Sequence, residues 1–287
     1  MPSLFKQIKK IFKSEKSSKK AAPTPAPKPA PKPAPKPVVA AAVAAPVAKV
    51  ASTPSHPENT HTNHTFAALV KSDAQLAALA DTKYTKAAPA SRVAAAKAGL
   101  EANGFKVHHV KSRGEAFDTI KSLIPVGASV NNAHSTSLEE IGFITYLKGE
   151  TPWNNIHAKI LAETDPAKQG ELRRTIGTTV DYYLTSMSAV TEDGKLAHAD
   201  LSGSKVGGVA FAAANVIVLV GANKIVKDEE EAWTRTNEFA LAAESARARD
   251  AYGVPASMIV HYEVISRANP MNPGRIQVVL VEDILGF

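Results

Sequence analysis

The chain has 287 residues, a formal net charge of +7 and no cysteine. The charge is uneven, because residues 1–65 hold eleven Lys and two Glu, a net of +9, which leaves −2 for residues 66–287. A nearly neutral folded part argues against nucleic acid as a partner. The lack of cysteine excludes disulfides, thiol catalysis and thiolate metal sites.

Residues 1–20 are predicted to form a short basic amphipathic helix. Lysines fill one face, and apolar residues recur with helical spacing on the other: Leu4, Phe5, Ile8, Ile11 and Phe12. Such a helix fits an anionic membrane surface or the groove of a partner. The alternatives are a solubilising tail and a mitochondrial presequence, of which the presequence is disfavoured because the first Arg is Arg92.

Residues 21–65 are predicted to be a disordered linker. Pro-Ala-Pro-Lys occurs three times in succession at 25–36, which favours an extended polyproline spacer without a core. His56, His61 and His64 are interpreted as solvated side chains rather than metal ligands. The sequence has neither an apolar run of the ~20 residues that span a bilayer nor the core of a signal peptide, so a cytoplasmic protein is expected.

Strands and helices are predicted to alternate from residue 66 to residue 287, which indicates one α/β domain with a mainly parallel sheet. Val216 to Val220 has no polar interruption, so this run is predicted to be a central strand buried on both faces. The other predicted strands are 105–110, 128–132, 182–186, 258–266 and 275–281. The predicted helices are 66–80, 87–102, 112–123, one ending at Leu147, one or two within 155–179, 206–213 and 228–250.

Several motifs in the second half of the chain carry a resemblance to a known family. They are Thr185, Ala189 to Gly194, Gly203 to Val206, Val216 to Val226, and Gly274 to Phe287. In this order they resemble the LUD-domain family, named after lactate utilisation, over roughly residues 70–287. The resemblance implies a fold similar to the sugar-phosphate isomerase and CoA-transferase group, without a settled reaction. Some members have a Cys-rich segment before the last strand, whereas residues 246–267 of this chain cannot ligate an iron–sulfur cluster. No cofactor is therefore expected.

The first candidate site follows the strand predicted at 128–132. Its residues offer amides, an imidazole and hydroxyls that suit a phosphate or carboxylate: Asn132, His134, Ser135 and Thr136. A capping role for Ser135 or Thr136 at the next helix is the alternative, and both roles are compatible.

Two further loops contain a glycine and a cation. Gly203, Ser204 and Lys205 form a candidate anion cradle, for which a packing turn is the alternative. Gly221, Asn223 and Lys224 follow the predicted central strand, where the lysine can meet an acidic ligand. Pairing of Lys224 with a carboxylate, Glu192 or Asp200, is the alternative.

Glu192 is the candidate catalytic residue. Fold relatives with transferase activity use a glutamate to form an acyl intermediate with CoA, and the resemblance makes Glu192 the residue to compare. A structural carboxylate next to the turn at Asp193-Gly194 is the alternative. His198 and Asp200 share a face if they lie on a strand, but a third ligand is missing from the pattern, so no metal site is predicted.

We predict that the three loops converge on one pocket at the carboxyl edge of the sheet, with Glu192 near its rim. The two lysines favour a small anionic metabolite, a carboxylate or phosphate, and the resemblance suggests organic-acid metabolism. The alternative is a catalytically silent interaction or scaffold protein that the basic tail tethers to a membrane or a partner. Enzymatic activity and homo-oligomerisation are left open.

Overall fold

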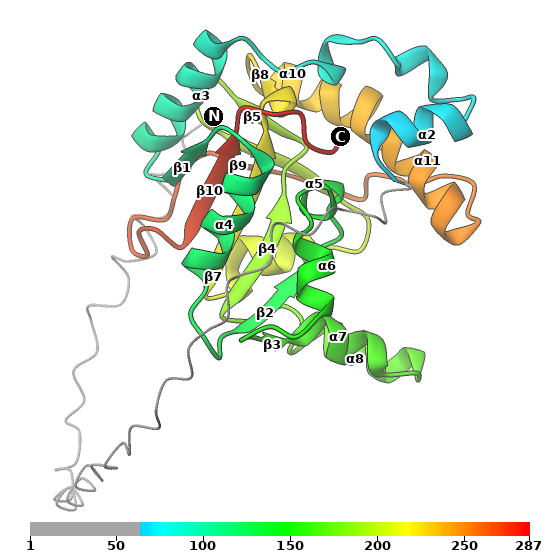
Figure 1. Ribbon diagram of the computed structural model, residues 1–287, viewed down its shortest axis with the longest axis vertical. Coiled ribbons are helices and arrows are strands. Elements are labelled where there is room, and N and C mark those ends of the chain that lie inside the picture. The colour runs from blue at the N-terminus through cyan, green and yellow to red at the C-terminus, as the bar shows by residue number, and fades with distance from the viewer. Residues whose placement is uncertain (1–63) are drawn as a thin grey trace, which may run out of the picture. The chain divides into compact units, whose positions relative to one another are not determined.

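The computed structural model describes residues 64–287, so the segment predicted at 1–20 and all but the last two residues of the linker predicted at 21–65 lie outside the described residues. Within this part, six parallel strands form one sheet in the order β1-β10-β7-β4-β2-β3 (Figure 1). The predicted α/β fold with a mainly parallel sheet is confirmed. The strands are β1 (Lys106–Val110), β2 (Ser129–Asn132), β3 (Asn154–Asn155), β4 (Tyr182–Ser186), β7 (Asn215–Gly221) and β10 (Ile276–Val281).

Strand β7 is central, with β10 on one side and β4 on the other. Successive side chains of a strand point to opposite faces of the sheet. Val216, Val218 and Val220 accordingly enter one core cluster, whereas Ile217 and Leu219 enter the other. This double burial explains why the strand is a continuous apolar run.

Helices cover both faces of the six-stranded sheet (Figure 1). The first core cluster contains residues of α3 (Ala90–Ala102) and α7 (Ile156–Ala162), and α8 (Pro166–Arg174) follows α7. The second core cluster is formed with α4 (Arg113–Leu123), α5 (Thr136–Glu140) and α6 (Phe143–Lys148). The carboxyl edge of the sheet lies between these layers.

A second sheet, which the sequence did not predict, lies beyond the carboxyl ends of β4 and β7. Its order is β8-β5-β6-β9, with β6 antiparallel to both β5 and β9. Gly194, with φ +82°, turns the chain from β5 into β6, as the Asp-Gly pair predicted. The strands are β5 (Ala189–Thr191), β6 (Leu196–Asp200), β8 (Ile225–Val226) and β9 (His261–Ile265).

The long helix predicted at 228–250 is present and contains a π-helical turn. It comprises α10 (Glu229–Thr234), the turn η5 (Arg235–Ala240) and α11 (Leu241–Tyr252). The Asp228 carboxylate caps its start by accepting a hydrogen bond from the Glu231 amide, at 3.0 Å. Helix α2 (Phe66–Ser72) packs against α11 through Leu69.

Two predicted helices have different bounds in the structure. The helix predicted at 66–80 ends at Ser72, because Asp73 turns the backbone and accepts a hydrogen bond from the Gln75 amide, at 2.9 Å. Short 3-10 turns follow, η1 (Ala77–Leu79) and η2 (Lys83–Thr85). The helix predicted at 206–213 is one α-helical turn, α9 (Ser204–Gly207), and then a π turn, η3 (Gly208–Ala212).

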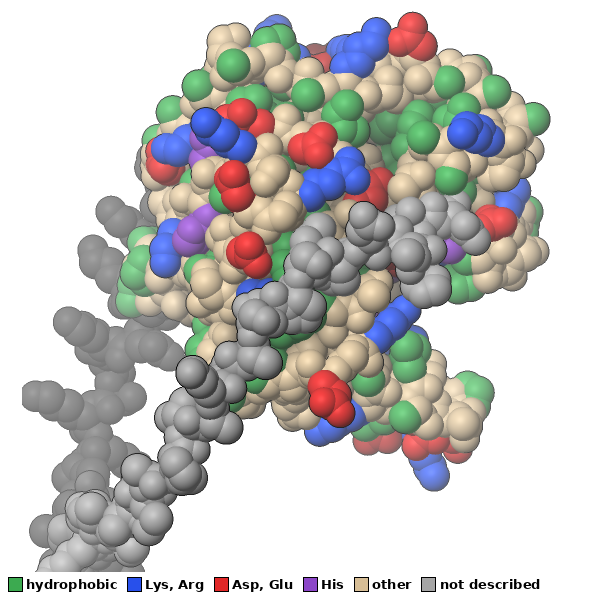
Figure 2. Space-filling view, in the orientation of Figure 1, with side chains coloured by type: hydrophobic (Ala, Val, Ile, Leu, Met, Phe, Trp, Pro, Cys, Tyr) green, Lys and Arg blue, Asp and Glu red, His purple; other side chains and the backbone are tan. Residues whose placement is uncertain are grey.

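The surface of the described part carries both signs of charge. Figure 2 shows basic and acidic side chains interspersed on the face in view. Among residues 64–287, no helix is both long and apolar enough to cross a membrane.

Candidate functional site

The loop after β2 packs against the end of β4. Ser135 caps α5, because its Oγ accepts a hydrogen bond from the Leu138 amide at 3.2 Å, and it also donates to Ser186 Oγ at 3.0 Å. Thr136 is 5% exposed, and its hydroxyl has no hydrogen-bond partner within the described residues. The amide of Asn132 donates to the Ala133 carbonyl at 3.1 Å. In this loop, therefore, Ser135 caps the helix, and the buried hydroxyl of Thr136 has no partner within the described residues.

Lys224 connects the loop after β7 to the loop after β2. It lies in the 3-10 turn η4 (Ala222–Lys224) and is 1% exposed. Its Nζ donates to Ser137 Oγ at 3.0 Å, and the ion pairs formed within residues 64–287 do not include it. The observed partner is thus a hydroxyl and neither of the carboxylates considered from the sequence, Glu192 and Asp200.

Residues 284–286, the C-terminal strap, lie across these two loops. Asn223 accepts from the Leu285 amide at 3.0 Å and donates to the Gly286 carbonyl at 3.1 Å. Ser137 Oγ donates to the Leu285 carbonyl at 3.2 Å, and Glu140 accepts from the Gly286 amide at 2.8 Å. Side chains thus bind all four backbone polar groups of Leu285 and Gly286.

Gly221 allows the backbone of this strap to pack closely against it, so the space beside the glycine is filled. A Cβ added to Gly221 would lie 2.6 Å from the Leu285 amide nitrogen. The small residue predicted to admit a ligand therefore admits the chain's own backbone. Sequence reasoning missed the strap, because its Leu-Gly pair carries no local signal for the loops on which it packs.

Gly203, Ser204 and Lys205 begin α9, as predicted. Gly203 has φ +80°, and a Cβ added there would lie 3.1 Å from His261 Nε2, so glycine is required at this turn. Ser204 Oγ lies 2.9 Å from Ser202 Oγ. Lys205 is partly buried, and its Nζ donates to the Ala199 carbonyl at 3.2 Å.

The three loops are close enough for their charges to interact. Burial lowers the pKa of Lys224 well below its usual value, and the positive charges of Arg235 and Lys205 act in the same direction, against the carboxylate of Glu140. Loss of solvation also lowers the pKa of Lys205, opposed by the Asp200 and Glu244 carboxylates. Both amines are thus desolvated, and the charge of Lys205 acts on Lys224.

His134 completes this group. Loss of solvation lowers its pKa to about 4, and the charges of Arg247 and Lys205 add to the effect. The side chain nevertheless keeps 38% of its surface exposed, and its Nδ1 lies 3.7 Å from Glu139 Oε1. Exposure and the nearby carboxylate act against this decrease, and with a pKa below its usual value of about 6.5 the imidazole is neutral at pH 7. We refer to His134, Thr136, Lys205 and Lys224 as the crevice group, after the crevice predicted from the sequence; the two cavities described below are lined by other residues.

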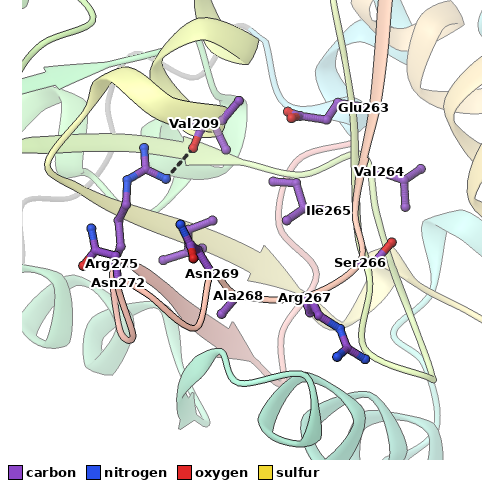
Figure 3. Close-up of a pocket in the computed structure, with 12 residues that line it drawn as sticks. Val209, Glu263, Val264, Ile265, Ser266, Arg267, Ala268, Asn269, Asn272 and Arg275 are labelled. Atoms are coloured by element: carbon purple, nitrogen blue, oxygen red, sulfur yellow. Dashed lines mark hydrogen bonds between the residues drawn. The ribbon is translucent and has the colours of Figure 1, made fainter. Parts of the chain in front are cut away.

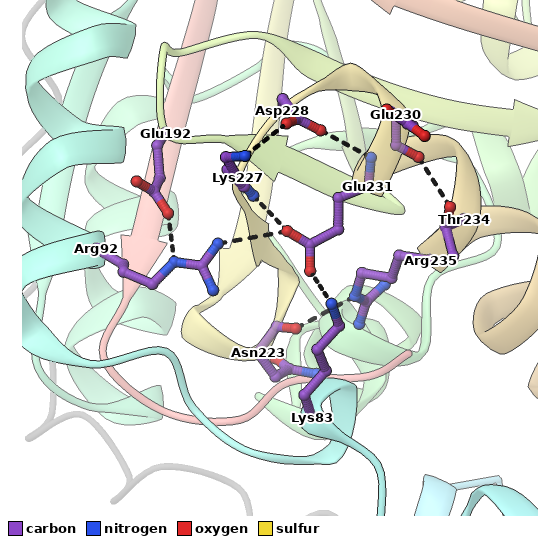
Figure 4. A network of polar contacts seen from close by, with 10 residues as sticks. All are labelled: Lys83, Arg92, Glu192, Asn223, Lys227, Asp228, Glu230, Glu231, Thr234 and Arg235. Atoms are coloured by element: carbon purple, nitrogen blue, oxygen red, sulfur yellow. Dashed lines mark hydrogen bonds and ion pairs between the residues drawn. The ribbon is translucent and has the colours of Figure 1, made fainter.

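Glu192 belongs to an ion-pair network on the other side of Asn223 (Figure 4). Its Oε1 accepts from Arg92 Nε, and Arg92 Nη2 lies 3.5 Å from Glu231 Oε2. Lys83 Nζ lies 2.5 Å from the second Glu231 oxygen. A cavity of about 180 Å³ is lined by Arg92, Asn223 and Glu231, among others. Glu192 is thus held by Arg92 beside this cavity.

Arg235 is a buried cation that sequence reasoning did not identify. It is 0% exposed, and its guanidinium lies over the rings of Tyr84 and Phe239, at 5.6 and 5.2 Å from their centroids. It donates to the carbonyls of Asn223, at 3.2 Å, and Ser188, while its Nη2 has no partner within the described residues. Burial lowers its pKa to about 9.

A cavity of about 320 Å³ lies elsewhere, between β9 and the π turn η3 (Figure 3). Glu263 enters it and accepts a hydrogen bond from His198 Nε2 at 2.7 Å, across the β6–β9 ladder. Arg275 at its wall donates to the carbonyls of Gly208, Val209 and Ala213. His198 is therefore paired with Glu263, and the described residues contain no metal-binding cluster of three or more His, Asp or Glu.

A structure described as a DUF162 family protein from Deinococcus radiodurans is similar to this chain at 15% sequence identity, covering 67% of this chain and 97% of that one, with a TM-score of 0.36. A comparison with curated proteins found no match. The family model of the LUD domain matches residues 93–281. The match spans more than half of the chain, all ten parallel and antiparallel strands, and the loops at 132–137, 203–205 and 221–224, so this protein belongs to the LUD-domain family.

Proposed function

We propose that this LUD-domain protein binds a small anionic metabolite, a carboxylate or phosphate, at the crevice group. One observation carries the proposal: Lys205 and Lys224 are both desolvated, the charge of Lys205 acts on Lys224, and within residues 64–287 neither amine forms an ion pair. Burying a cation without a counter-charge is unfavourable. An anionic ligand supplies that charge chiefly to Lys205, which is only partly buried.

Two neutral groups support an oxygen-rich ligand. The Thr136 hydroxyl is buried without a partner in the described part of the chain, so it is available to a ligand oxygen. The neutral imidazole of His134 can donate to one ligand atom or accept from another. Family membership makes organic acids related to lactate the first class to test, followed by sugar phosphates and CoA esters.

Thermal unfolding of the full chain with each ligand class tests the proposal. A ligand at 100 times its Kd stabilises the folded state by about 2.7 kcal/mol, so one anionic class should raise Tm. Lys205→Met should remove most of this increase. Lys159→Met makes the same chemical change at an exposed position on α7 and should preserve it.

Absence of stabilisation by every anionic class would overturn the proposal. The chain would then be better explained as an interaction protein whose residues 1–20 bind a membrane or a partner. Equal losses in Lys205→Met and Lys159→Met would show that net charge, and not the crevice, determines binding.

A further inference from the structure

The Lys224 amine lies directly beneath the C-terminal strap. A Cβ added to Gly286 would lie 3.5 Å from Lys224 Nζ and 2.6 Å from Ser137 Oγ. Gly286 also has φ +56°, a backbone conformation that favours glycine. The strap therefore covers the amine with bare backbone and leaves it 1% exposed.

The hydrogen bonds around Ser137 leave the nitrogen lone pair of Lys224 unused. The single hydroxyl hydrogen of Ser137 is donated to the Leu285 carbonyl. The Ser137 oxygen must therefore accept from Lys224, at 3.0 Å, and cannot donate to it. An uncharged Lys224 amine held in this way keeps its lone pair available for reaction.

We propose that Lys224 is a nucleophilic amine that forms an imine with a carbonyl-bearing acid, such as a 2-oxo acid, when the C-terminal strap opens. The nitrogen adds to the carbonyl carbon, and the two amine hydrogens leave with the carbonyl oxygen as water. The inference rests on the proposed function only for the acid group of the ligand, which Lys205 would bind.

The surroundings of Lys224 favour the uncharged form that this step needs. Burial lowers its pKa, as do the charges of Arg235 from η5 and Lys205 from α9, while Glu140 from α5 opposes them. Each unit by which a lysine pKa falls increases its neutral fraction at pH 7 about tenfold. The same combination of desolvation and a neighbouring cation activates lysines for imine chemistry in general.

Opening of the strap breaks no strand ladder. The strap lies beyond β10, and its backbone hydrogen bonds, two of them at Ile284, are made to side chains. Opening must also expose Leu285, which is fully buried in the second core cluster, so the covered state dominates in the wild type. The strap thus covers the Lys224 amine until it opens.

Reductive trapping tests the inference. The full chain is incubated with glyoxylate and cyanoborohydride at pH 7, and adducts at Lys224 and at the exposed Lys159 are quantified by peptide mass spectrometry. We expect Gly286→Ala to raise the rate at Lys224 at least about tenfold over the wild type and to leave Lys159 unchanged. Gly127→Ala is the matched control, because Gly127 has φ +83° but no atom within 4 Å of an added Cβ.

The outcomes separate this inference from the proposed function. If Lys224 reacts no faster than Lys159 in the wild type and in Gly286→Ala, the nucleophilic role is wrong, even where lactate or a sugar phosphate raises Tm. If Lys224 reacts equally with glyoxylate and with uncharged formaldehyde while no anion raises Tm, the amine is reactive and the anion site is wrong. Should Gly286→Ala fail to fold, Asn223→Ala, which removes the strap bonds at the Leu285 amide and the Gly286 carbonyl, gives the same comparison.

Discussion

The crevice and the ion-pair network hold their cations in opposite ways. Around Glu231, Lys83 and Arg92 each lie within 4 Å of a carboxylate, and Arg92 also contacts Glu192 (Figure 4). In the crevice, Lys224 donates to a hydroxyl and Lys205 to a backbone carbonyl. The network thus neutralises its own charge, whereas neither crevice amine is in an ion pair within the described residues.

This difference separates positions that stabilise the fold from positions that are available for binding. Paired cations hold the segment around residues 83–92 against α10, and removing one partner leaves the other uncompensated. The crevice amines contribute no such pair within the described residues, so the fold does not depend on their charge. Substitutions in the two regions should therefore affect different measurements.

Glu231→Gln should give the largest loss of stability. The Glu231 carboxylate is bonded by Lys83 Nζ, by the Lys227 amide at 2.7 Å and by Arg92, and its side chain is 15% exposed. Loss of hydrogen bonds to a charged group costs about 1.5–3 kcal/mol, measurable as a decrease in the free energy of unfolding in urea. Glu230→Gln at the adjacent exposed position should change stability by no more than about 0.5 kcal/mol. Equal changes in the two variants would remove the distinction.

Lys224→Met should have the opposite effect, with little change in stability and weaker ligand binding. Replacing the buried amine by an apolar side chain of similar length removes its hydrogen bond to Ser137 but also removes the cost of burying the amine, so the free energy of unfolding should stay within about 1 kcal/mol of the wild type. Ligand affinity should fall about tenfold, or about 1.4 kcal/mol, because a hydrogen-bonding group is lost from the site. Calorimetric titration and urea unfolding measure the two effects. A large loss of stability would make Lys224 a structural residue and would count against the anion site.

His134→Gln should change how stability depends on pH. The folded protein holds the pKa of His134 at about 4, below the usual value of about 6.5, so only the unfolded chain takes up the proton between these values. Stability contributed by the neutral imidazole is therefore lost as pH falls from about 6.5 towards 4. Because 38% of the side chain is exposed, the effect is discounted to about 1 kcal/mol.

The variant should lose less stability over this pH range than the wild type. Urea unfolding at several pH values between 4 and 7 measures the difference, with Arg247, Glu244, Lys205 and His64 as the charged groups that face His134. If the free energy of unfolding depends on pH in the same way in the two proteins, the pKa of His134 does not change on folding.

The sequence predicted the parallel sheet well because its strands are short apolar runs. Val216 to Val220 is a continuous apolar run of strand length, which predicts a strand buried on both faces, and it also lies within the family motifs. The second sheet was missed, although β9 lies within the strand predicted at 258–266, because β6 mixes apolar residues with His and Asp, which gives no clear alternation, and no local signal assigns these strands to a separate sheet. The contacts of these strands with one another, at a separation of more than 60 residues, decide their conformation.

The candidate site was predicted in composition but not in its contacts. Lys205, Lys224 and the hydroxyls near 135–137 follow strand ends, and a parallel sheet brings such ends to one edge. The C-terminal strap and Arg235 depend on packing between distant segments, for which a single sequence has no periodicity. For the same reason, the sequence could not show that Arg92, one hundred residues away, holds Glu192.

Glu192→Gln should have the smallest effect and most directly tests how far the crevice extends. Glu192 and Arg92 are each 31% exposed, and ion pairs of this exposure contribute about 0–1 kcal/mol, so the unfolding free energy should fall by less than that. A double-mutant cycle with Arg92→Met would show whether the loss comes from their contact. Because Arg92 holds the carboxylate in the network, anion-induced stabilisation should be the same in Glu192→Gln and in the wild type. A tenfold loss of ligand affinity in Glu192→Gln, with Arg92→Met unaffected, would instead show that the carboxylate turns from Arg92 to the ligand, and would extend the crevice across Asn223 to the end of β5.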